Sequence, residues 1–178
     1  MTNAEDVFIF VTVGTDHHPF DRLVDWTERW FVLCEHPLSC LIQKGTSTPP
    51  GRCEWVDYLP YCEMERTLRA ATAVVCHGGP GTIILSLDLG KKPIVVPRRR
   101  ALGEHVDDHQ AFFARRLFGA GEIELAETEE SFRHSLDTAI AHDRPAHRIW
   151  RQRTAGASVT RFTELVDEMM ASLGAEAD

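Results

Sequence analysis

The chain alternates between short apolar runs and longer stretches in which apolar residues recur at helical spacing. Val7–Val13 (VFIFVTV) is almost continuously apolar, which is typical of a strand buried on both faces of a parallel sheet. Between Phe20 and Phe31 the apolar side chains recur three or four positions apart, which predicts a helix that begins near Pro19. The start of the chain therefore has the strand-then-helix pattern of an α/β protein.

The same alternation continues to the end of the chain. Further strands are predicted at 40–43, 54–58, 73–76, 93–96 and 122–125, and further helices at 63–71, 80–89, 106–117, 129–142 and about 145–173. The last helix has an apolar face from Val159 to Leu173, which either packs on the sheet or docks on a partner. We expect a single domain over residues 1–178, with a Rossmann-like parallel sheet and helices on both faces. Ligands of such sheets bind beyond the carboxyl ends of the strands.

Composition and charge narrow the function classes. The 178 residues are 43% hydrophobic and 26% charged, which is enough for one domain with a sizeable core. The net charge of −8 argues against a broad nucleic-acid-binding surface. The apolar runs are too short to span a bilayer, and the N-terminus has no signal-type stretch. We therefore expect a cytoplasmic protein.

The five cysteines do not form a recognisable framework. Their number is odd, and none of them is spaced as C-x-x-C, so neither a disulfide scaffold nor a zinc site is favoured. We expect reduced thiols that are mostly buried and act as small hydrophobic residues.

Two glycine-containing turns follow predicted strands, Gly14–Thr15 after the first and His77–Thr82 (HGGPGT) after the fourth. Glycine permits a positive φ and the close approach of a ligand, and the helix that follows offers free N–H groups to a phosphate. Neither turn has the G-x-G-x-x-G or the G-x-x-x-x-G-K-[ST] pattern, so NAD binding and a Walker-type site are not supported. Each turn also makes sense as a tight connection, but the histidine in the second favours a ligand there.

His77 has three possible roles. It can donate a hydrogen bond to a phosphate oxygen, cap the helix that follows, or act as a catalytic base. We favour contact with a phosphate, because the sequence places no serine or carboxylate at a spacing that would orient His77 as a base.

The stretch 95–110 (VVPRRRALGEHVDDHQ) leaves the fifth predicted strand at the same edge of the sheet. After three arginines it gathers polar side chains: Glu104, His105, Asp107, Asp108, His109 and Gln110. Two histidines and three carboxylates can bind a metal ion, but acidic residues also suit the solvated first turn of a helix. We favour a site without metal, because this mixture of short acceptors and amides suits a polyhydroxylated ligand.

Three separated motifs together resemble a known family. The stretches FVTVGTDHHPFDRLV, HGGPGT and LGKKPIVVPRRRALGEHVDDHQ carry the resemblance, and CEWVDYLP also fits. They resemble the family 28 glycosyltransferase C-terminal domain, and the resemblance runs from about Phe8 to Ala114. The chain is more closely similar to the small, donor-binding subunit of two-part bacterial polysaccharide glycosyltransferases. That subunit is related to the catalytic subunit of the dolichol-linked N-acetylglucosaminyltransferase. The resemblance implies the nucleotide-sugar-binding C-terminal half of a GT-B enzyme.

The resemblance also implies roles for individual residues around a UDP-sugar donor, with no cofactor and no metal. The diphosphate would be held by His77, Gly78, Gly79, Gly81 and Thr82. His109 and Gln110 would contact the donor sugar, and the site would be lined by Gly14, Thr15, Arg98, Glu104 and His105. Leu85 stands where many relatives carry a glutamate that binds the ribose, so Ser86 or Asp88 is a candidate substitute.

By resemblance, the chain is a UDP-sugar-dependent hexosyltransferase subunit that transfers the sugar to a lipid-linked saccharide in polysaccharide or glycan biosynthesis. It would act with a separate, membrane-anchored, acceptor-binding subunit, which would hold it at the membrane. Two alternatives remain open: a stand-alone UDP-sugar epimerase or hydrolase, and a non-catalytic regulatory subunit that binds a nucleotide sugar.

Overall fold

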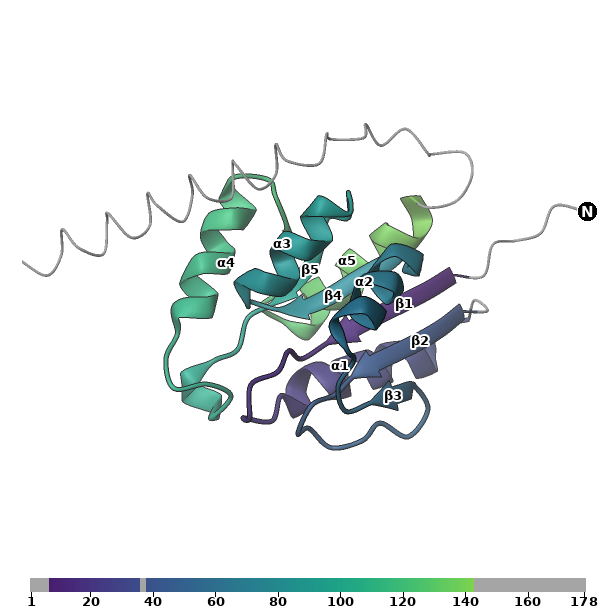
Figure 1. Cartoon of the computed structure of the whole chain (residues 1–178), viewed down its shortest axis with the longest axis horizontal. Helices are drawn as coiled ribbons and strands as arrows, with labels where there is room; N and C mark the ends of the chain where they lie inside the picture. Colours follow the sequence, from purple (N-terminus) through teal and green to yellow (C-terminus); the bar gives the residue numbers. More distant parts are fainter. Residues whose placement is uncertain (1–6, 36–37, 143–178) are drawn as a thin grey trace, which may run out of the picture.

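The computed structural model describes residues 7–35 and 38–142. They form one parallel sheet with helices on both faces (Figure 1). The strands are β1 (Val7–Thr12), β2 (Leu38–Gln43), β3 (Glu54–Val56), β4 (Ala73–His77), β5 (Ile94–Val96) and β6 (Glu124–Leu125). The helices are α1 (Asp21–Leu33), α2 (Tyr61–Ala70), α3 (Pro80–Asp88), α4 (His109–Gly119) and α5 (Glu129–His142), with a 3₁₀ turn η1 (Arg100–Leu102). The helix predicted at about 145–173, with its apolar face, lies outside the described residues.

The order of the strands places a topological switch point at the centre of the sheet. The order is β3-β2-β1-β4-β5-β6, and every neighbouring pair is parallel. The chain builds outward from β1 through β2 to β3, then returns to β4 on the other side of β1 and continues to β6. Because the order reverses between β1 and β4, the crevice beyond their carboxyl ends is where a doubly wound sheet binds ligands.

Side chains that alternate along the strands pack against helices on the two faces of the sheet. Ile9 and Val11 pack on the side of α1 and α5, in a cluster that includes Phe132 of α5. Phe10 packs on the opposite side, against Leu68 of α2. Helices α2, α3 and α4 cover that second face (Figure 1). The almost continuous apolar pattern of β1 therefore has the predicted cause, burial on both faces.

Helix α4 begins at His109 and not, as predicted, at Val106. Asp107 Oδ1 accepts a hydrogen bond from the backbone N–H of His109 at 3.1 Å, and Asp108 Oδ1 accepts one from Arg100 N–H at 3.0 Å. Such local bonds from aspartate side chains compete with helical bonds and favour a helix start. Val106 is left 65% exposed in the preceding loop, so its apolar character misled the prediction.

His77 is the last residue of β4 and not the first of the loop, as the predicted end at residue 76 implied. It pairs with Val96 of β5 in the parallel register. The sheet therefore fixes the backbone of this histidine. β3 is also shorter than predicted, ending at Val56.

The five cysteines are free thiols and, as predicted, most of them are buried. Cys40, Cys53 and Cys76 are buried, Cys34 is half-buried and Cys62 is exposed on α2. Among residues 7–35 and 38–142, no helix combines the length and the apolar character that crossing a bilayer requires.

Candidate functional site

Three loops meet beyond the carboxyl ends of β1, β4 and β5, at the switch point of the sheet. They are residues 13–20 after β1, the short connection between His77 at the end of β4 and Pro80 at the start of α3, and residues 97–108 before α4. All the site residues predicted from the sequence lie in these loops or in the first turns of α3 and α4. The topology therefore brings the predicted residues to one edge of the sheet.

The imidazole ring of His77 fills the space between two glycines. A Cβ atom built at Gly14 would lie 2.3 Å from Cε1 of His77, and one at Gly79 would lie 2.1 Å from Nε2. Both distances are far too short for any side chain. Gly14 also has a φ of +83°, a conformation that other residues rarely adopt. The histidine ring therefore requires a glycine at both positions.

The other two glycines of the HGGPGT loop differ in what surrounds them. A Cβ atom at Gly78 would lie 2.8 Å from Cβ of Gln110, so this glycine lets the first turn of α4 pack on the loop. In contrast, nothing in the described part of the chain lies within 4 Å of a Cβ atom at Gly81. Of the three loop glycines, Gly81 is thus the one that leaves the backbone open to a ligand.

The N-terminus of α3 has the features of an anion-binding site. Its N-cap residue, Gly79, has no side chain to satisfy the first N–H groups, and its first residue is Pro80. The helix dipole places partial positive charge at this end, and the free N–H groups of the first turn point outward along the axis. Thr82, in the same turn, is half-buried. An anion placed beside Gly81 would satisfy these groups.

His77 is buried in an electrically neutral form. Burial, and then the charge of Arg98, lower the pKa of His77 from 6.5 to about 4. Its Nδ1 atom is buried and has no hydrogen-bond partner among the described residues. At neutral pH the ring can therefore donate one hydrogen bond but carries no charge.

Arg98 is fully buried and holds two of the loops together. Its guanidinium donates hydrogen bonds of 2.8 Å to the backbone carbonyl groups of Val13, His18 and Glu104, and it lies 4.8 Å from the centre of the Phe20 ring. Both Nη atoms thus donate within the protein, whereas Nε is buried and has no hydrogen-bond partner among the described residues. These bonds let Arg98 position the loop after β1, and its predicted contact with a ligand stays a prediction.

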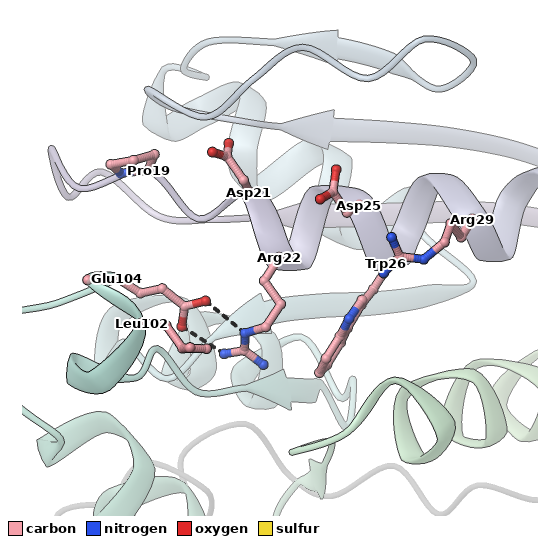
Figure 2. Close-up of a pocket in the computed structure, with 9 residues that line it drawn as sticks. Pro19, Asp21, Arg22, Asp25, Trp26, Arg29, Leu102 and Glu104 are labelled. Atoms are coloured by element: carbon pink, nitrogen blue, oxygen red, sulfur yellow. Dashed lines mark hydrogen bonds and ion pairs between the residues drawn. The ribbon is translucent and has the colours of Figure 1, made fainter.

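Glu104 makes an ion pair with Arg22, a residue that the sequence reasoning missed. Nε and Nη2 of Arg22 lie 2.7 and 2.8 Å from the two carboxylate oxygens of Glu104 (Figure 2). Glu104 also accepts a hydrogen bond from the backbone N–H of Arg99 at 2.8 Å. The bidentate geometry ties α1 to the loop before α4. A shallow groove runs along α1 beside this pair, but no residue of the HGGPGT loop lines it (Figure 2).

Two further polar residues hold the turn after β1. The backbone N–H of Gly14 donates to Oγ1 of Thr12 at 3.1 Å, and the side-chain amide of Gln43 donates to the same oxygen at 3.0 Å. Thr12 and Gln43 are both buried. Their positions at the ends of β1 and β2 are a signal that the sequence offered and that the prediction did not use.

Three predicted residues lie at the rim of the site. Thr15 is exposed. His109, the first residue of α4, is also exposed, and its Nδ1 atom lies 2.9 Å from a carboxylate oxygen of Asp107. His105 is mostly buried, and its Nε2 atom lies 3.7 Å from Asp16. Gln110 lies deeper, with its side-chain oxygen accepting a hydrogen bond of 3.4 Å from the backbone of Arg98.

The two candidate substitutes for the missing glutamate differ in their surroundings. Leu85 packs in the apolar cluster around Phe10. Ser86 is fully buried, and its hydroxyl donates to the carbonyl of Thr82 at 2.8 Å. Asp88 is the last residue of α3, about 10 Å along the axis from the glycine loop. The Ser86 hydroxyl is thus already engaged within α3, whereas Asp88 lies three positions beyond Leu85 and stays a candidate.

The fold is similar to that of several solved glycosyltransferases. CalG4, the calicheamicin glycosyltransferase, is 16% identical with a TM-score of 0.60, over 97% of this chain and 43% of that one. The glycotransferase of kitacinnamycin is 18% identical with a TM-score of 0.59, over 96% and 41%. MurG of Acinetobacter baumannii is 19% identical with a TM-score of 0.56, over 78% and 42%. Comparison with curated proteins found no match.

The chain spans less than half the length of these enzymes, and at such identities the likeness shows the fold alone. That fold is the C-terminal half of a GT-B glycosyltransferase. A family model, described as the glycosyltransferase family 28 C-terminal domain, matches residues 8–169, which is most of the chain. The resemblance of the three motifs is thereby confirmed at the level of the family: this chain belongs to the glycosyltransferase family 28 C-terminal domains.

Proposed function

We propose that the chain binds a UDP-sugar and transfers its sugar to a lipid-linked saccharide, acting with a separate acceptor-binding subunit. The observation that carries the proposal is the uncovered N-terminus of α3 at the switch point, where Gly81 leaves the backbone open. In a chain of this family, that is where a nucleotide diphosphate would meet free N–H groups and the helix dipole.

His77 supports the same site. Its Nε2 atom lies against Gly79 at the start of α3, and its buried ring is neutral at pH 7. A neutral imidazole can donate a hydrogen bond to a phosphate oxygen, and a bound anion would raise its pKa. As the glycosidic bond breaks, negative charge grows on the diphosphate. The N–H groups of α3 and His77 would stabilise that charge without any cofactor.

The rim of the site would hold the sugar. His109 is exposed at the start of α4, and the backbone of its neighbour Gln110 packs on Gly78. Side chains from this turn would therefore stand beside a diphosphate bound at α3. Thr15 is exposed in the facing loop, and we propose it as a further contact.

The acceptor would be bound by another protein. The chain covers 41–43% of the solved glycosyltransferases described above, which leaves their other half unaccounted for. We propose that a membrane-anchored subunit supplies that half, binds the lipid-linked acceptor and holds this chain at the cytoplasmic face of the membrane.

One observation favours a second function, a regulatory subunit that binds a nucleotide sugar without catalysing transfer. Leu85, at the position of the expected glutamate, packs into an apolar cluster, and the Ser86 hydroxyl bonds to the carbonyl of Thr82. A weaker hold on the ribose would suit a sensor of the donor. If the chain is such a regulatory subunit, it would bind the nucleotide sugar, and the His77→Ala variant would leave the rate of sugar transfer by the complete complex unchanged.

Calorimetric titration of the chain with UDP, UDP-glucose and UDP-N-acetylglucosamine tests the first proposal. We expect one site, weakened by His77→Ala and unchanged by His134→Ala, a matched control on α5. In an assay with the partner subunit and acceptor, His77→Ala should lower turnover on the order of 100-fold. Absence of UDP binding by the folded chain would refute the proposal. Retained binding with unaltered turnover of His77→Ala would favour the regulatory function.

A further inference from the structure

The turn after β1 gathers three side chains that bind metal ions in other proteins. Asp16, His17 and His18 each offer one ligand atom, and these atoms all lie within 4.8 Å of one another. Nδ1 of His18 lies 2.7 Å from Oδ1 of Asp16, and Nδ1 of His17 lies 3.9 Å from the same oxygen. The two imidazole rings are 4.0 Å apart between centroids.

A fourth side chain comes from a distant part of the sequence. His105, in the loop before α4, places Nε2 at 3.7 Å from Oδ2 of Asp16. Its ring centroid is 6.1 Å from that of His18. Two loops that follow different strands thus direct imidazole groups toward one carboxylate.

The spacing of these atoms suits a small transition-metal ion. Nitrogen and oxygen ligands lie about 2.0–2.2 Å from zinc, so two of them in a tetrahedral site are about 3.3 Å apart. The distances of 2.7, 3.9 and 3.7 Å to the Asp16 carboxylate lie on both sides of that value. The shortest of them is a hydrogen bond between His18 Nδ1 and Asp16 Oδ1, which an ion bound between the two atoms would replace.

The backbone that carries the ligands is already fixed. Oγ1 of Thr46 donates a hydrogen bond of 2.9 Å to the carbonyl of His17. The buried guanidinium of Arg98 donates one of 2.8 Å to the carbonyl of His18. Anchored ligands lose little freedom when the ion arrives, which is how supporting contacts strengthen metal sites.

We propose that Asp16, His17, His18 and His105 form a binding site for a divalent transition-metal ion of the zinc type. Imidazole and carboxylate together suit Zn²⁺, Co²⁺ or Ni²⁺, whereas Mg²⁺ and Ca²⁺ prefer sites made of oxygen atoms. The site lies between the loop after β1 and the loop before α4, next to the candidate diphosphate site. It goes beyond the proposed function, because it requires no nucleotide sugar and no partner.

Titration of the full chain with Zn²⁺ by calorimetry, and with Co²⁺ by visible absorption, tests the site. We expect one equivalent to bind, with imidazole-type Co²⁺ absorption bands. Asp16→Asn, His17→Ala and His18→Ala should each weaken binding about tenfold or more, and His105→Ala should also weaken it. His134→Ala, which removes an exposed histidine of α5, should leave the affinity unchanged.

Two results would overturn the proposal. One is an unaltered Zn²⁺ affinity in Asp16→Asn and His18→Ala variants whose circular dichroism matches the parent chain. The other is displacement of the ion by an equal concentration of Mg²⁺. Failure of the metal site is separable from failure of the proposed function, because UDP titration of metal-free chain in the presence of a chelator reports on the diphosphate site alone.

Discussion

Alanine substitutions at Gly79 and Gly81 should have opposite consequences, although the two residues are only two positions apart. At Gly79 the new Cβ would lie 2.1 Å from Nε2 of His77, whose ring is buried with Gly14 on its other side. The ring cannot move aside, so the core is overpacked. The φ of Gly79 is −77°, which alanine adopts readily, so no backbone strain is added. Overpacking alone costs about 1–3 kcal/mol.

At Gly81 the same substitution meets open space. Nothing among the described residues lies within 4 Å of its Cβ, and the residue is in the first turn of α3. Replacing glycine by alanine in a helix stabilises it by up to about 1 kcal/mol. The methyl group would, however, stand where a bound phosphate must approach the backbone. We therefore expect Gly81→Ala to keep its stability and to lose affinity for UDP.

Urea unfolding gives the free energy of unfolding, and calorimetric titration gives the UDP affinity. A double-mutant cycle with His77→Ala adds a sharper test, because removing the ring should relieve the overpacking in Gly79→Ala. Two results would refute this reasoning. One is a loss of stability in Gly81→Ala as large as that in Gly79→Ala. The other is a cost of Gly79→Ala that is the same with and without the His77 ring.

Three further predictions concern the charges of the site. Because the folded chain lowers the pKa of His77 from 6.5 to about 4, the unfolded chain binds more protons between those pH values. The free energy of unfolding should therefore fall by up to about 3 kcal/mol between pH 7 and pH 4, and His77→Gln should lose less over the same range in urea unfolding. Arg98→Met should lower the free energy of unfolding by about 3 kcal/mol or more, because it leaves buried carbonyl groups unpaired. Arg98→Lys should not restore this stability. The control Arg100→Met, at an exposed position, should cost less than about 0.5 kcal/mol. His109→Ala should preserve the melting temperature and weaken binding of UDP-sugars more than binding of UDP; equal weakening of both would contradict a sugar contact.

The order of the elements and the location of the site could be predicted because both depend on local patterns. The apolar run of β1 and the helical spacing of α1 are visible in short windows, and a parallel α/β sheet follows from their alternation. The glycine loop at His77 stands out for the same reason. Its place beyond the carboxyl end of β4 then follows from a general rule about such sheets.

The roles of the individual residues could not be predicted, because they depend on contacts between distant parts of the chain. Gly79 and Gly81 are equivalent in the sequence, and only the position of the His77 ring distinguishes them. Likewise, nothing near Arg98 in the sequence indicates that it bonds to Val13 and His18, about 80 positions away. The partnership of Arg22 with Glu104 is of the same kind.

The buried guanidinium of Arg98 has a consequence for how the protein matures. It joins the exits of β1 and β5, which become neighbours only after β4 has been inserted between them. Contacts between such distant segments form late, because the intervening chain must first be ordered. A partly folded chain would thus have the glycine loop without the contacts that hold together the loop after β1 and the loop before α4. We therefore expect the candidate site to become ordered late in folding.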